Sequence, residues 1–331
     1  MKEEAHLPPL VTNSAKEVTV SSEEMRKYKA IDTMCRLNYC QFDPARAQKS
    51  FEIFEFRVMV ETTFAGVAKR MGLKPGEEWK LFQWMSKGSV EEMIKEMDEI
   101  GVEYVLIDQT IGWSVRDHRV WGHSTLEQIA GVIEKSKGRV IGGASYNPFR
   151  IKESLEEITR AVKDLGFKYV WFHPISFGLA PNDKKCYPLY AKCLELGIPV
   201  CFQVGHSAEP LPSLVGHPML ADEVAIDFPD LTMVLTHTGW PWIEEWMSML
   251  WRHPNVYGNI GAYFPSDLHR DLVSFMDSGR GRHKVLWATN GFGLTRCKKE
   301  FLELPIKEET KKMVLYENAL KVFKIEPRKE A

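Results

Sequence analysis

The feature that most constrains the fold is a regular alternation of short apolar runs with amphipathic stretches, which begins at Lys29. Eight runs have the length of a buried strand: KAIDTMC, EYVLIDQ, RVIGGASYN, KYVWFHP, PVCFQVG, TMVLTHTG, NVYGNIGA and KVLWATN. Nearly all are followed by stretches such as SVEEMIKEMDEI, in which apolar residues recur every three or four positions, as on one face of a helix. Gly166 and Gly197 stand where helix C-caps are expected. The chain therefore alternates strand and helix.

This alternation predicts an α/β fold with a parallel sheet and helices outside it. Eight such units in 331 residues favour a (β/α)8 TIM barrel, with an open doubly wound sheet as the alternative. Residues 38–90 lie outside the repeat and are predicted to form a helical insertion after strand 1 that caps the barrel mouth. A C-terminal helix, IKEETKKMVLYENALKVF, closes the chain. No linker divides the sequence, so residues 1–331 are expected to form one domain.

The composition argues against several classes of protein. Lys and Arg number 43 against 45 Asp and Glu, without long runs of one sign, so neither nucleic acid nor an anionic membrane is an expected partner. No segment approaches the roughly 18 apolar residues of a membrane span, and the polar start lacks a signal-peptide core, so we expect a cytoplasmic protein. The six cysteines form no C-x-x-C pair, which favours reduced thiols over a zinc site.

Polar residues follow the predicted strands at their carboxyl ends, where barrel enzymes carry their active sites. They include Arg36, Asp108, His173, Gln203, His237 and Asn290. An arginine, an aspartate and two histidines converging on one face predict a pocket, although each residue alone could be a satisfied polar group at the rim.

Aromatic residues near the same face divide into two groups. Trp113 and Tyr263 are expected to stack on a flat substrate. Trp171 and the tryptophans of residues 240–246 are expected to pack within the barrel or under a helix. The loop HSAEPLPSLVGHP, after strand five, is the expected lid.

Three segments resemble the amidohydrolase-related family, the barrel group that includes amino-carboxymuconate-semialdehyde decarboxylase and the resorcylate decarboxylases. They are GFKYVWFHPISFGLAPNDKKCYPLYAKCLELGIPVCFQVG, FPDLTMVLTHTGWPWIEE and KVLWATNGF. The resemblance covers about residues 29–325 apart from the insertion, and it implies the barrel fold and an active site at the strand ends.

The sequence departs from the family at the metal. The resemblance implies a D-x-H-x-H motif in strand one, a His after strand five and an Asp after strand eight. Met34, Arg36, Gln203 and Asn290 stand there instead. Repulsion between a guanidinium and a divalent cation beside it would cost roughly several kcal/mol, even near the protein surface. We therefore expect no metal and no other cofactor; a rearranged metal set of His173, His237 and Asp108 is a further alternative.

The resulting hypothesis is a metal-independent enzyme, a hydrolase, hydratase or decarboxylase acting on a small cyclic or unsaturated carboxylate. Arg36 would bind the carboxylate, because its donors match that group. His237 matches the proton-handling histidine that the resemblance implies and would act as general acid or base, with Asp108 and His173 as helpers. The alternative is a non-catalytic ligand-binding or assembly subunit. The insertion and the C-terminal helix are candidate surfaces for a homodimer.

Overall fold

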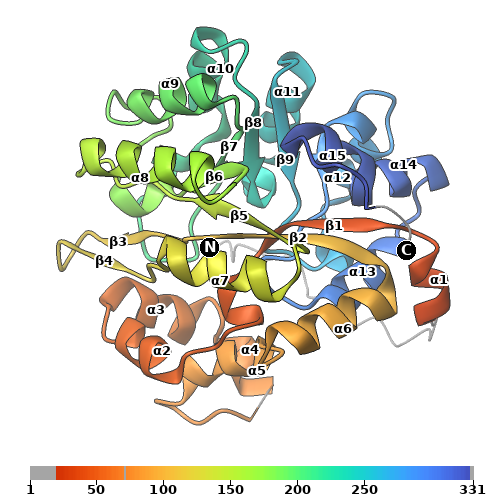
Figure 1. Ribbon diagram of the computed structural model, residues 1–331, viewed down its shortest axis with the longest axis horizontal. Helices are drawn as coiled ribbons and strands as arrows, with labels where there is room; N and C mark the ends of the chain where they lie inside the picture. The colour runs from red at the N-terminus through yellow and green to blue at the C-terminus, as the bar shows by residue number, and fades with distance from the viewer. Residues whose placement is uncertain (1–19, 71, 329–331) are drawn as a thin grey trace, which may run out of the picture.

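The computed structural model describes residues 20–70 and 72–328, and it confirms the predicted barrel. Eight parallel strands follow one another in the order β1-β2-β5-β6-β7-β8-β9-β10 (Figure 1). Their bounds are β1 Ala30–Cys35, β2 Val102–Asp108, β5 Val140–Ala144, β6 Tyr169–Phe172, β7 Val200–Gln203, β8 Met233–Thr236, β9 Val256–Asn259 and β10 Val285–Leu286. Each run that the sequence marked as a strand overlaps one of them.

Helices connect successive strands on the outside of the barrel (Figure 1). The main ones are α6 Val90–Ile100, α7 Leu126–Lys135, α8 Ile151–Lys163, α9 Tyr187–Leu196, α10 Asp222–Asp227, α11 Ile243–Arg252, α12 Arg270–Met276 and α13 Leu294–Leu302. Local sequence explains their ends. Thr125 and Gln128 form a reciprocal capping box that starts α7, and Gly197 ends α9 in the left-handed conformation at φ 66°.

The barrel closes between its last and first strands through hydrogen bonds of irregular spacing. The Thr33 amide donates to the Trp287 carbonyl at 3.1 Å, and the Asn290 amide donates to the Met34 carbonyl at 2.7 Å. The buried Asp32 carboxylate reinforces this seam, because it accepts the Thr289 amide at 2.9 Å and the Thr289 hydroxyl at 2.6 Å. The seam brings the residues that follow β1 and β10 side by side.

The insertion folds into a separate group of short helices on one side of the barrel (Figure 1). They are α2 Pro44–Phe51, α3 Phe54–Thr62, α4 Ala65–Arg70 and α5 Leu81–Met85. These helices bury their own apolar cluster, and the Lys87 amide donates to the Tyr39 carbonyl at 2.6 Å, which joins the two ends of the insertion. A hairpin that the sequence did not predict, β3 Gly112–Ser114 with β4 Arg119–Trp121, lies beside α3 (Figure 1).

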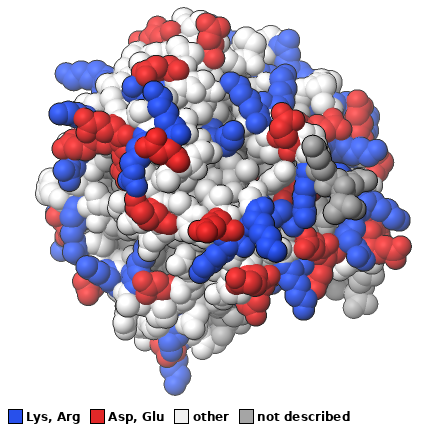
Figure 2. All heavy atoms as spheres, in the orientation of Figure 1, with Lys and Arg blue, Asp and Glu red and all other residues white. Residues whose placement is uncertain are grey.

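The C-terminal segment seals the barrel interior. It comprises α14 Glu308–Lys312, a π-turn over Met313–Glu317 and α15 Asn318–Phe323. Phe323 packs edge-on against Tyr169 of β6, with ring centroids 5.6 Å apart. Within the described part of the chain, no helix is both long and apolar enough to span a membrane. Acidic and basic side chains alternate over the face that Figure 2 shows, without a broad patch of one sign.

Candidate functional site

A cavity of about 620 Å³ lies at the carboxyl ends of the strands, between the barrel and the insertion. From the barrel its lining includes Arg36, Trp171, His173, Gln203, His237, Tyr263 and Asn290. From the insertion it includes Arg46, Phe56, Met59, Phe64 and Phe82. The barrel supplies most of the titratable groups, and the barrel and the insertion both supply apolar walls, a combination that suits a small polar molecule with an apolar body.

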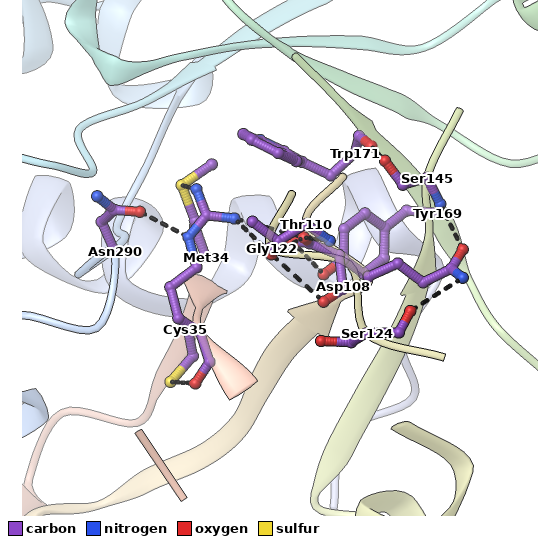
Figure 3. A network of polar contacts seen from close by, with 12 residues as sticks. Met34, Cys35, Asp108, Thr110, Gly122, Ser124, Ser145, Tyr169, Trp171 and Asn290 are labelled. Carbon is purple, nitrogen blue, oxygen red and sulfur yellow. Dashed lines mark hydrogen bonds and ion pairs between the residues drawn. The ribbon is translucent and has the colours of Figure 1, made fainter. Parts of the chain in front are cut away.

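Arg36 follows β1 and is fixed by residues that follow two other strands. Its Nε donates to Asn290 Oδ1 at 2.7 Å. Its Nη1 donates to Thr110 Oγ1 at 3.2 Å and lies 3.4 Å from Asp108 Oδ1. Figure 3 shows Asn290 on one side of this network and Asp108 and Thr110 on the other. The guanidinium is therefore held in place before any ligand arrives.

The second terminal nitrogen of Arg36 has weaker partners. Among the residues that the structure describes, the one hydrogen-bond acceptor of Nη2 is a thioether, Met34 Sδ at 3.5 Å, and the guanidinium carbon lies 4.3 Å from the Trp171 ring centroid. A thioether is a weak acceptor, so Nη2 keeps donor capacity. The sequence placed Trp171 in a packing layer, but its ring also lines the cavity and stacks under the cation.

Asp108 is buried and does not line the cavity, so the structure places it behind Arg36 rather than among the groups that face a ligand. Burial raises its pKa, while Arg36 and the Thr110 hydrogen bonds act in the opposite direction. Its Oδ1 accepts the Thr110 amide at 2.9 Å and the Thr110 hydroxyl at 2.8 Å. These contacts place the Asp108 carboxylate between the Arg36 guanidinium and the backbone of Thr110.

His237 follows β8 and lines the cavity. Its Nε2 lies 3.1 Å from Met34 Sδ, and its amide donates to Asn259 Oδ1 at 3.3 Å. Burial, Arg36 and His173 lower its pKa well below the ordinary value of 6.5. The imidazole is therefore neutral near pH 7, a form that accepts protons.

Several residues around the cavity adopt a backbone conformation that side chains disfavour. The φ angle is 48° at Thr110, 68° at His237, 69° at Ala262 and 55° at Asn290, and all four line the cavity. Left-handed residues other than glycine cost free energy and collect at functional sites. The local strain supports a binding role for this end of the barrel.

A second polar cluster lies across the cavity. His173 follows β6 and is buried; its Nε2 is 3.5 Å from Glu209 Oε1 and 3.3 Å from Ser207 Oγ. Ser207 also donates to Glu209, and Gln203 Nε2 donates to Ser207 Oγ at 3.5 Å. Burial alone would raise the pKa of Glu209, but the charge and hydrogen bond of His173 and the Ser207 hydroxyl lower it to about 2. Glu209 is thus a carboxylate on the cavity wall.

Of the two aromatic residues predicted to stack on a substrate, one lies at the cavity. Tyr263 lines the cavity, whereas Trp113 does not. Trp113 packs against Phe149 and Phe177, with ring centroids 5.1 and 6.0 Å away. Trp113 belongs to β3 of the hairpin that the sequence did not predict, and both of its ring neighbours follow later strands of the barrel.

Sequence reasoning missed Glu209 and Arg46. Glu209 lies in the loop HSAEPLPSLVGHP, which the sequence predicts as a lid and where no strand end marks a site residue. The two ends of that loop are joined, because the Gly205 amide donates to the Gly216 carbonyl at 2.7 Å. Arg46 is one of several charged residues of the helical insertion, and the strand-end rule that singled out the other site residues does not apply there.

The fold and this cavity define a (β/α)8 barrel enzyme site of the amidohydrolase type. The chain belongs to the Amidohydrolase family, whose sequence model matches residues 39–325. The comparison with curated protein sequences found no significant match.

Solved structures with the same fold support this placement. An uncharacterised TIM-barrel protein from Bordetella bronchiseptica is 26% identical, with a TM-score of 0.68 over 89% of this chain and 98% of that one. A 2,6-dihydroxybenzoate decarboxylase from Rhizobium is 17% identical, with a TM-score of 0.61 over 90% and 98%. A manganese-bound 5-carboxyvanillate decarboxylase from Novosphingobium aromaticivorans is 15% identical, with a TM-score of 0.63 over 91% and 97%. The two decarboxylases share the fold with this chain.

A divalent metal does not suit the residues of this cavity. Within the described part of the chain, no group of three or more His, Cys, Asp or Glu side chains is arranged to hold a metal ion. The rearranged set of His173, His237 and Asp108 is therefore not such a cluster. The end of β1 presents the Arg36 guanidinium instead, which contacts Asn290 at 2.7 Å and repels a cation.

Proposed function

We propose that the protein is a metal-independent enzyme that acts on a small cyclic or unsaturated carboxylate. Arg36 binds the carboxylate and His237 moves the proton. The reaction is a hydrolysis, a hydration or a decarboxylation. Family membership and the fold shared with enzymes named for benzoate-type acids support a carboxylate substrate.

The observation that carries the proposal is the fixed guanidinium on the cavity floor beside a neutral imidazole. Asn290 and Asp108 hold Arg36 from two sides, at 2.7 and 3.4 Å, so the cation does not need to reorganise when an anion binds. Its Nη2 keeps donor capacity, and a charge-assisted hydrogen bond there would orient the acid.

The charge of Arg36 also links binding to proton transfer. Arg36 is one of the causes that lower the pKa of His237. A bound carboxylate would offset that positive charge and raise the pKa of His237, which strengthens the ring as a base only when substrate is present. This favours a general-base role, such as activation of a water for attack on a lactone or a double bond.

The test is an activity survey of protein purified without added metal. Lactones, unsaturated acids and aromatic acids are assayed with and without a chelator, alongside elemental analysis of the same sample. We expect turnover of at least one carboxylate, no loss of activity on chelation and well under one equivalent of zinc, manganese or iron. Stoichiometric metal whose removal abolishes activity would refute the proposal.

A ligand-binding subunit without catalysis is the second candidate, and one observation favours it. Arg36 already has a carboxylate partner in Asp108, at 3.4 Å, so part of its charge is satisfied without substrate. Tight binding of a carboxylate without turnover of any tested acid would select this candidate.

A further inference from the structure

A second arginine lines the cavity from the insertion. Arg46, near the start of α2, is half-buried. Its Nη1 donates to Ser124 Oγ at 3.0 Å, and its Nη2 donates to the Gly122 carbonyl. Its Nε has no hydrogen-bond partner among the residues that the structure describes. The guanidinium is thus oriented by neutral groups and retains unused donors.

Arg46 differs from Arg36 in its charge balance. Across residues 20–70 and 72–328, no carboxylate lies within ion-pair distance of Arg46, whereas Arg36 has Asp108 at 3.4 Å. Asp43 is close in sequence, but its carboxylate caps α2 and accepts the amides of Ala45 and Arg46 at 3.0 and 3.2 Å. Burial lowers the pKa of Arg46 and the nearby charge of Asp43 raises it, yet a guanidinium stays charged in proteins. A partly desolvated cation that forms no direct ion pair favours an anionic ligand.

The two arginines bond to neighbouring points of one segment. Arg36 donates to Thr110, and Arg46 donates to Gly122. An ideal Cβ built at Gly122 would lie 3.6 Å from the Thr110 carbonyl oxygen, so the backbones of these two residues are neighbours (Figure 3). Both arginines also line the same cavity, so a small molecule with two anionic groups can contact both.

We propose that Arg46 binds a second anionic group of the substrate, so that the cavity selects acids carrying two such groups over monocarboxylates. This inference rests on the proposed function, because it takes the first carboxylate to lie at Arg36. In this proposal the insertion contributes to substrate specificity. Arg36 of the barrel binds the carboxylate that orients the reaction, and Arg46 of α2 binds the anionic group at the other end of the molecule.

Calorimetric titration with benzoate and isophthalate, which differ by one carboxylate, tests the inference. We expect wild-type protein to bind isophthalate more tightly. Arg46→Met should weaken isophthalate by about tenfold or more while changing benzoate by less than about twofold. Arg46→Lys, which keeps the charge, should retain part of the preference. Arg57→Met is the matched control, because Arg57 belongs to the same insertion, pairs with Glu61 at 3.9 Å and does not line the cavity.

The other outcomes are decisive in different ways. Equal weakening of both acids by Arg46→Met, with a lower Tm, would show that Arg46 only fastens the insertion to the barrel and would overturn the inference. A wild-type protein without preference for isophthalate, or without affinity for either acid, would also overturn it. Failure of the proposed function looks different: Arg36→Met would then leave benzoate binding unchanged while Arg46→Met still removed the preference for isophthalate.

Discussion

Two pairs of a basic residue and a carboxylate belong to the site, and their carboxylates respond to their surroundings in opposite ways. Arg36 lies 3.4 Å from Asp108, and His173 lies 3.5 Å from Glu209. Burial raises the pKa of Asp108 in spite of the arginine. In the other pair His173 and Ser207 outweigh burial and lower the pKa of Glu209 to about 2. Similar distances therefore give different electrostatic outcomes.

The pairs also differ in the kind of cation. A guanidinium does not lose its proton in a protein, so the positive charge of Arg36 is permanent. An imidazole can lose its proton, so the His173–Glu209 pair is ionic only while His173 is protonated. The first pair builds a fixed positive site on strand ends, and the second is a titratable cluster that involves the loop after β7.

Breaking the Arg36–Asp108 pair is expected to lower the free energy of unfolding by the larger amount. Asp108→Asn leaves the Arg36 cation without a carboxylate and weakens the acceptor of the Thr110 amide, so the free energy of unfolding should fall by about 3 kcal/mol. Urea denaturation followed by circular dichroism measures this change. Asp98→Asn is the control, because Asp98 is exposed and its pair with Arg139 is expected to contribute about 1 kcal/mol at most. Equal effects of the two substitutions would show that the Arg36–Asp108 pair contributes no more to stability than an exposed pair does.

The next prediction asks which side of the cavity moves the proton. His237→Gln should lower kcat about a hundredfold or more on an identified substrate, because general acid–base catalysis contributes on that order. The pH–rate profile should also lose the limb that reports this base. His217→Gln serves as control, since His217 lies outside the cavity lining and caps the Pro218–Ala221 turn. Full activity of His237→Gln would show that His237 is not the general acid or base and would point to His173 or Glu209 instead.

The two pairs also differ in how far the sequence could predict them. Arg36 and Asp108 end regular strands, and strand ends meet at one face of a barrel, so their proximity follows from the alternation pattern. Glu209 lies beyond a strand, in a loop whose path depends on contacts such as that between Gly205 and Gly216. Periodicity cannot place such a residue.

The same limit applies to the insertion. Its helical character followed from the sequence, but the position of Arg46 depends on packing between α2 and the segment before α7. Trp113, predicted to stack on a substrate, lies outside the cavity lining for a related reason, because it belongs to a hairpin that the sequence did not predict. The homodimer remains a prediction.

The smallest expected effect concerns the titratable pair and appears as a pH dependence. The unfolded chain protonates Glu209 near its ordinary value of 4.5, whereas the folded protein resists protonation until its pKa of about 2. Stability from this group is therefore complete above about pH 4.5 and is lost as the pH falls. Between pH 5 and pH 3, wild-type protein should lose about 2 kcal/mol more unfolding free energy than Glu209→Gln. Urea denaturation of both proteins at each pH gives the comparison.

Only the difference between the two proteins isolates this effect, because Asp32 titrates in the opposite sense. Burial raises the pKa of Asp32 from 3.8 to about 6, so the folded protein takes up that proton first. Stability from Asp32 therefore rises as the pH falls from about 6 toward 4, which offsets the loss from Glu209 in the wild-type curve. Asp32 bonds to Thr289 at the barrel seam in both proteins, so its contribution cancels on subtraction. A flat difference would mean that the folded protein does not hold Glu209 as a stabilised carboxylate, leaving Arg36–Asp108 as the pair that sets the charge of the cavity.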